Sequence, residues 1–114
     1  MSKSVELVGI LSRCNNVLRD REDQIFYLTN ELERSAATQV FELAQYGRRS
    51  GNVYISGGSD SYPYAKETVS ALGRRLDAEG LELRTDSPRV KHDSDSWSAT
   101  FRVVIPESQE SQEY

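Results

Sequence analysis

Apolar residues in the first third of the chain recur with a helical period. Leucine, isoleucine or cysteine appears at alternating intervals of four and three residues from Leu7 to Leu32, with Arg21 in the one slot that is not apolar. This heptad-like spacing is typical of a helix that packs along one seam. It predicts helical structure over residues 5–46, ended by Gly47, because glycine suits the position just after a helix C-terminus.

The segment "CNNVLRDRED" leaves the number of N-terminal helices open. Its Asn and Asp residues favour helix caps, so one continuous helix and two helices with a break here both fit the pattern. In either case the apolar seam is longer than a small sheet can cover. We therefore expect a homo-oligomer joined by seam residues, and a helical hairpin packed over the sheet within a monomer is the alternative. The candidate interface residues are Leu18, Ile25, Leu28 and Leu32.

The rest of the chain alternates between strand-like and helical patterns. Residues 53–56 begin with three β-branched or aromatic side chains, and residues 65–76 carry apolar side chains at helical intervals ahead of Gly80. Residues 81–84 and 97–105 alternate between apolar and polar side chains, as half-buried strands do. A right-handed crossover would make the first two strands parallel, which predicts a small mixed three-stranded sheet.

These elements predict an α+β fold: an N-terminal helix or helical hairpin followed by a β-α-β-β unit over residues 53–105. The chain has 114 residues, which suits one compact domain, expected over residues 1–106. The polar, glutamate-containing tail over residues 107–114 is expected to be disordered.

Charge and cysteine content narrow the partners and the compartment. The net charge is −4, and no segment is strongly basic, so a nucleic-acid partner is possible but not favoured. Cys14 is the one cysteine, which excludes an internal disulfide and favours the reducing cytoplasm. We expect this thiol to be a small buried hydrophobic group. No apolar run is long enough to span a membrane, so no membrane partner is expected.

The stretch "ISGGSDSYPYAKE" places paired glycines between a predicted strand and a predicted helix. Such a turn can present backbone N–H groups to an anion, but the spacing matches neither a Walker A loop nor a dinucleotide fingerprint. The simpler interpretation is structural, with glycines that turn the chain, a polar residue that caps the helix and a proline in its first turn. The candidate ligand-binding residues are Gly57, Gly58, Ser59, Ser61 and Lys66.

Arginines and tyrosines of the second half could form a basic, aromatic surface. Such surfaces bind RNA or single-stranded DNA by charge and stacking. Acidic residues are interleaved with them, so ordinary surface charge is the favoured interpretation. The candidate nucleic-acid residues are Arg74, Arg75, Arg84 and Arg102.

Evidence for catalysis is weak throughout. "HDSDS" at residues 92–96 contains the right residue types for a metal site or a hydrolase triad, but triad members usually come from distant positions, and one histidine makes a loose metal set. A solvated hairpin loop is the favoured interpretation. We therefore expect no catalytic residues, no metal and no cofactor.

The leading hypothesis is a non-enzymatic binding or regulatory protein that acts through its surface. We expect its partners to be further copies of itself and an unidentified protein. Accessory inhibitors from mobile elements are of this size, and a role of that kind is one expectation. The alternatives are binding of a nucleotide or small anion at the Gly57–Lys66 loop, and RNA or DNA binding through the arginine and tyrosine surface.

Overall fold

The computed structural model describes residues 2–84 and 88–107, and for residues 2–8 it describes the helical backbone alone. The fold is α+β, as predicted. A long helix, α1 (Ser2–Gln45), is followed by β1 (Ser50–Gly58), a short 3-10 turn (Ser59–Ser61), α2 (Tyr62–Ala78), β2 (Glu82–Leu83), β3 (Lys91–His92) and β4 (Ser96–Val104). The tail predicted to be disordered lies, from residue 108, outside the described residues.

The N-terminal region is one continuous helix. The cap-prone residues Asn15, Asn16, Asp20 and Asp23 are all exposed, so their side chains are solvated and do not interrupt the backbone. Gly47 lies just after the end of the helix and has a φ of 74°. The N–H of the next residue, Arg48, donates to the carbonyl of Leu43 in the last turn. This is a Schellman-type ending and it confirms the predicted glycine cap.

Gly80 ends α2 in the same way. It has a φ of 99°, and the N–H of Leu81 donates to the carbonyl of Leu76 at 3.1 Å. A left-handed backbone at this position favours glycine because glycine has no Cβ to clash. The predicted helix and its terminating glycine are therefore confirmed.

Over the described residues the sheet has four strands, and the prediction of a mixed three-stranded sheet is wrong. β1, β2 and β3 each pair with β4, and every pair is antiparallel. β1 and β2 do run in the same direction, but β4 lies between them. The physical reason is that β4 carries the longest alternating apolar pattern, so it takes the central place, whereas β2 and β3 have two residues each and occupy an edge.

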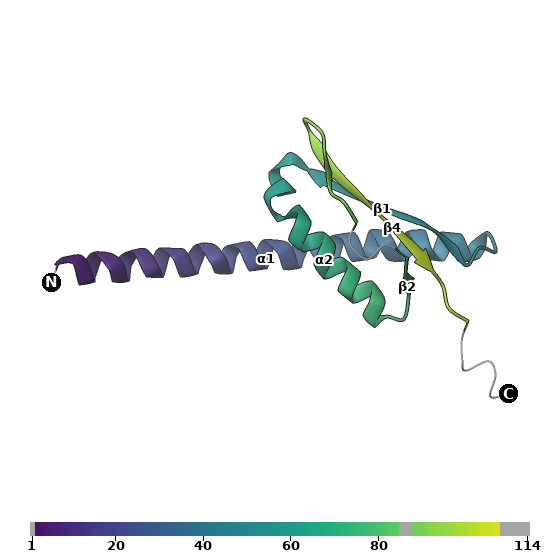
Figure 1. Cartoon of the computed structure of the whole chain (residues 1–114), viewed down its shortest axis with the longest axis horizontal. Coiled ribbons are helices and arrows are strands. Elements are labelled where there is room, and N and C mark those ends of the chain that lie inside the picture. Colours follow the sequence, from purple (N-terminus) through teal and green to yellow (C-terminus); the bar gives the residue numbers. More distant parts are fainter. Residues whose placement is uncertain (1, 85–87, 108–114) are drawn as a thin grey trace.

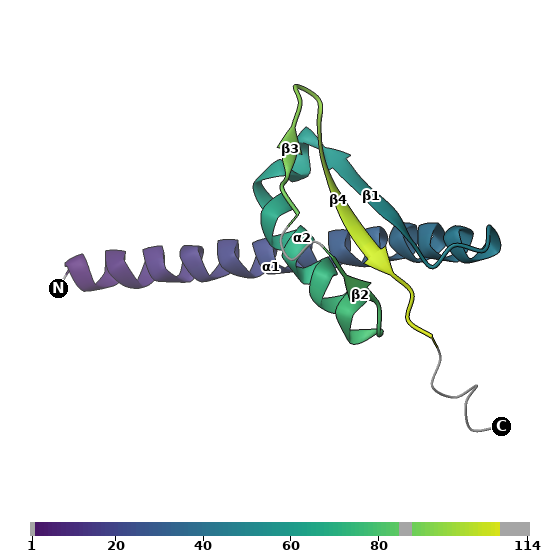
Figure 2. The ribbon, with the colours of Figure 1, turned by 45° about the vertical axis from the view of Figure 1, so that its right-hand side comes forward.

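The core lies between one face of the sheet and the two helices (Figures 1 and 2). The central strand and α2 contribute four core residues each, and in β4 every second side chain points inward and is buried. The opposite face of the sheet carries exposed side chains that include Tyr54, Thr100 and Arg102. The core residues are Leu32, Ala36, Val53, Ile55, Ala65, Val69, Leu72, Leu76, Trp97, Ala99, Phe101 and Val103.

The molecule is a compact body with a projecting helix. The N-terminal half of α1 extends away from the body, with no other described element beside it (Figure 1). The radius of gyration is 18.9 Å, whereas a compact chain of this length would have about 13 Å. We call the sheet, α2 and the part of α1 from residue 21 onward the body.

Candidate functional site

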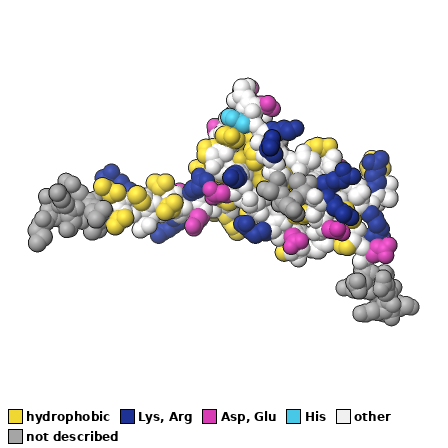
Figure 3. All heavy atoms as spheres, in the orientation of Figure 1, with side chains coloured by type: hydrophobic (Ala, Val, Ile, Leu, Met, Phe, Trp, Pro, Cys, Tyr) yellow, Lys and Arg dark blue, Asp and Glu magenta, His cyan; other side chains and the backbone are white. Residues whose placement is uncertain are grey.

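The projecting half of α1 carries an apolar surface that no described residue covers. Four large side chains on it are more than half exposed, and the thiol of Cys14 is exposed as well. The prediction that Cys14 is buried is wrong, because the seam continues past the end of the body that would have covered it. Figure 3 shows these hydrophobic side chains along the projecting helix. We call this surface the α1 stripe; it consists of Ile10, Leu11, Cys14, Val17 and Leu18.

The α1 stripe lies on the face of the helix that packs against the body further along. At 3.6 residues per turn, the stripe residues lie within about 60° of Cys14 around the helix axis. Arg21, Ile25 and Leu32 lie within about 20° of Cys14 around the same axis. Leu32 is 7% exposed and belongs to the core. One apolar face of α1 is therefore covered by the body in its C-terminal half and uncovered in its N-terminal half.

Arg21 marks the point where the covered part of this face begins. Its guanidinium pairs with the carboxylate of Glu67, donates to the carbonyl of Pro63 at 3.1 Å and lies 5.1 Å from the centre of the Tyr64 ring. All three partners belong to the start of α2. The polar residue that interrupts the apolar seam thus fastens α1 to α2.

The four residues predicted to form an oligomer interface differ in their burial. Leu18 is exposed, Ile25 and Leu28 are half-buried, and Leu32 is buried inside the chain. Leu32 packs in the core and has no surface to offer a partner. Sequence reasoning also missed Ile10 and Val17, because a strict heptad passes over residues that lie directly before the seam positions.

The glycine-rich loop is held by contacts within the chain. Ser61 accepts a hydrogen bond from the indole N–H of Trp97 at 2.7 Å and donates to the carbonyl of Gly58 at 2.9 Å. A Cβ on Gly57 would lie 2.5 Å from the same indole nitrogen. Ser59 donates to the carbonyl of Ser94 at 3.2 Å. These contacts support the structural interpretation of the loop, and ligand binding there stays a prediction.

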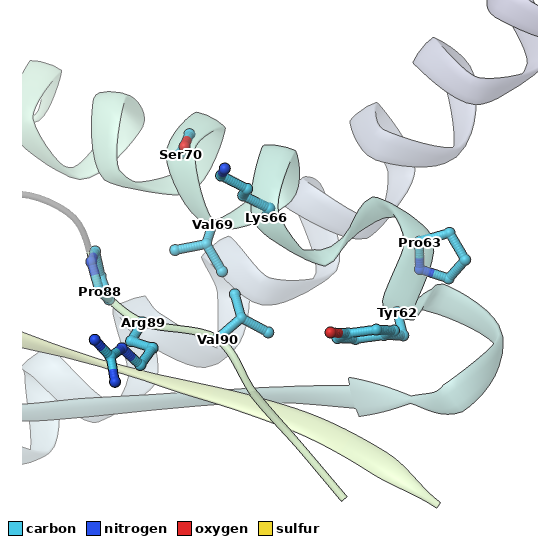
Figure 4. A pocket seen from close by; sticks show the side chains of 8 residues that line it. All are labelled: Tyr62, Pro63, Lys66, Val69, Ser70, Pro88, Arg89 and Val90. Carbon is cyan, nitrogen blue, oxygen red and sulfur yellow. The ribbon is translucent and has the colours of Figure 1, made fainter.

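Lys66, the fifth loop candidate, lines a separate open pocket of about 580 Å³ between α2 and residues 88–90. Two positively charged side chains, those of Lys66 and Arg89, line the pocket, and none of the described lining residues has a carboxylate. Figure 4 shows the two cations on opposite sides of Val69 and Val90, which form the floor. Anion binding by Lys66 therefore stays a prediction.

The four arginines predicted for nucleic acid do not share one surface. Arg75 is turned toward α1, where it donates to Asn30 at 2.6 Å and to Glu33 at 2.9 Å. Arg102 lies on the open face of the sheet, close to the backbone of Arg84, whose N–H donates to the Arg102 carbonyl at 2.8 Å. Arg74 is exposed on α2. Arg75 is thus engaged with α1, and nucleic-acid binding through the other three arginines stays a prediction.

The segment "HDSDS" forms the predicted hairpin connection between β3 and β4. The N–H of Asp93 donates to the carbonyl of Ser96 at 2.7 Å, which closes the turn. The ring of His92 stacks on Tyr62 with a centroid distance of 3.7 Å and an angle of 7°. Across the described ranges, no three His, Cys, Asp or Glu side chains are grouped as a metal site would require.

Gln39 makes a contact that no local sequence pattern indicates. Its side-chain amide donates to the carbonyl of Tyr54 at 2.7 Å and accepts from the Tyr54 N–H at 2.8 Å. The amide thus occupies the place of a neighbouring strand along the outer edge of β1. Because unpaired strand edges promote association, this contact protects the sheet at that point.

None of the helices in the described part of the chain combines the length and the apolar character that crossing a bilayer requires. Comparison of the chain with models of protein families, with curated proteins and with solved structures found no match.

Proposed function

We propose that this protein is a non-enzymatic binding protein whose copies join through the α1 stripe. The observation that carries the proposal is the uncovered apolar surface between Ile10 and Leu18. Most helical stability in proteins comes from packing of the apolar face, and no described residue packs against this part of α1. Asn15 and Asn16 are also poor helix formers. A partner that covers the stripe would supply the missing packing.

A second copy of the chain is the partner that the stripe suits best. The polar residues of the same segment lie at least about 100° around the helix from Cys14, so the apolar surface is one continuous face about 120° wide. One further helix laid along this face would cover its middle, as in helical dimers. In such an assembly each body keeps its surface available for a further protein partner.

The test is the mass of the protein in solution, measured by size-exclusion chromatography with light scattering over a range of concentrations. We expect twice the 12.9 kDa of a single chain for the wild type. Leu18→Lys places a charge in the stripe and should halve the mass. The matched control is Asn16→Lys, which puts the same charge on the polar face of the same turn and should leave the mass unchanged.

Other outcomes of these measurements would contradict the proposal. A wild type that stays at the single-chain mass at every concentration would overturn self-association. Circular dichroism of both variants shows whether each remains folded. Native mass spectrometry of the freshly purified protein supplies the second readout, because a retained nucleotide or small anion would favour the ligand-binding alternative instead.

A further inference from the structure

We infer that the second copy lies antiparallel on the α1 stripe, with a two-fold axis passing beside Cys14. This inference rests on the proposed function, since it assigns the orientation and the stoichiometry of the same contact. It makes the assembly a closed dimer. Three features of α1 carry it: the spacing of the stripe, the position of the body and the small residue at the centre.

The spacing of the α1 stripe is the same in both directions from Cys14. Ile10 and Leu11 precede it by four and three residues, and Val17 and Leu18 follow it by three and four. A copy turned end for end about Cys14 therefore brings its own Ile10 and Leu11 level with Val17 and Leu18. On both sides of the axis, large apolar side chains of one chain therefore pack against large apolar side chains of the other. This is the self-complementarity that a two-fold interface needs.

The position of the body excludes the parallel arrangement. The stripe and the body share one face of α1, and the body covers that face from Arg21 to the end of the helix. A parallel copy laid on the stripe would run straight into α2 and the sheet over residues 21–45. In the antiparallel arrangement about Cys14, only residues 2–7 of the copy come level with residues 21–26, near the start of α2.

The residue on the two-fold axis is small, which allows the two helices to approach each other closely. Cysteine is smaller than the leucine, isoleucine and valine around it, so two helices can come together at Cys14 while the larger side chains pack on either side. The other residues of this segment are polar or glycine and point away from the stripe. They leave no second apolar face for a third helix, which limits the assembly to two chains.

The arrangement has a consequence for binding. Residues 14 and 21 are seven positions apart, so the two Arg21 side chains begin about 21 Å apart along the shared axis. Each body begins level with residue 7 of the other helix, and the two bodies lie at opposite ends of an elongated dimer. Two identical surfaces at a fixed separation favour a target that carries two copies of the same feature, because the second contact forms at high effective concentration.

Disulfide trapping between two different single-cysteine chains tests the orientation. One chain carries Leu11→Cys with Cys14→Ser, and the other carries Leu18→Cys with Cys14→Ser. The two are mixed and oxidised with glutathione disulfide, which accepts the two electrons released when two thiols form a disulfide and lose two protons. The antiparallel dimer predicts the mixed disulfide as the main product, because Leu11 of one chain lies beside Leu18 of the other.

The parallel arrangement predicts the two homodisulfides instead, and that result would overturn the inference while leaving self-association intact. A wild type that is monomeric by light scattering would remove the proposed function together with the inference. If the chains dimerise and no disulfide of either kind forms, the interface lies elsewhere and the inference is again wrong.

A charge-pair variant provides a second, independent readout that needs no cysteine chemistry. Leu11→Glu and Leu18→Lys should each halve the mass when introduced alone. The double variant should recover the dimer, because the antiparallel arrangement brings opposite charges together twice. A parallel arrangement would instead bring like charges together. A double variant that remains monomeric while folded would count against the antiparallel pairing.

Discussion

The indole nitrogen of Trp97 donates a hydrogen bond to the hydroxyl of Ser61 across 2.7 Å, from the first residues of β4 to the turn before α2. Trp97 is fully buried, and Ser61 is its hydrogen-bond acceptor within the described chain. A buried indole without an acceptor would carry the full cost of its lost hydration. The bond therefore joins the glycine-rich loop to the core.

Ser61→Ala should destabilise the protein by about 1–3 kcal/mol, because it leaves the Trp97 N–H without its acceptor. Denaturant unfolding followed by the fluorescence of the single tryptophan measures the change. Ser70→Ala, exposed on α2, is the control and should stay within about 0.5 kcal/mol of the wild type. Equal stability of the two variants would show that the bond contributes nothing.

The adjacent glycines should respond in opposite ways to alanine. A Cβ at Gly57 would lie 2.5 Å from the Trp97 indole nitrogen and 2.7 Å from the Ser61 hydroxyl, so Gly57→Ala should cost about 1–3 kcal/mol through overpacking. Gly58 has open space and a φ of −75°, so Gly58→Ala should be stabilising by about 0.4–1 kcal/mol. Thermal unfolding of the pair provides the comparison, and a loss of stability in both variants would contradict the expected difference.

Gln39→Leu should loosen the outer edge of β1. The substitution removes both hydrogen bonds to the Tyr54 backbone, at an expected cost of about 0.5–1.5 kcal/mol, because water can replace part of the contact at this exposed site. Hydrogen exchange of the Tyr54 amide should accelerate. The same substitution at Gln45, exposed at the end of the helix, serves as the control. Unchanged exchange at Tyr54 would argue that the edge is protected by other means.

Two buried threonines should differ in how their replacement by valine changes the stability of the protein. Thr68 is fully buried, and its hydroxyl has no hydrogen-bond partner among the described residues. Thr68→Val should therefore be neutral or stabilising by up to about 1 kcal/mol. Thr29 is equally buried, but its hydroxyl donates to the Ile25 carbonyl at 2.6 Å, so Thr29→Val should gain less or lose stability. Denaturant midpoints of the two variants measure the difference, and a more stable Thr29→Val would refute it.

Local patterns along the chain were sufficient for the class of fold and for the presence of most elements. The helical period of α2, the glycines that end both helices and the alternation in β4 each depend on residues a few positions apart, and all three are present in the structure. The apolar seam of α1 was also recognisable. What it packs against was not, because periodicity shows that one face is apolar without showing what covers it.

The tertiary structure decided the strand order and the division of the α1 seam. Pairing depends on which strand buries the most apolar surface, so β4 displaced the expected parallel neighbour of β1. The body is shorter than α1 and begins to cover it at Arg21, which buries Leu32 and leaves Leu18 exposed although both occupy seam positions. The sequence by itself thus determined that α1 has one apolar face, and only the packing of α2 and the sheet determined which half of that face remains open.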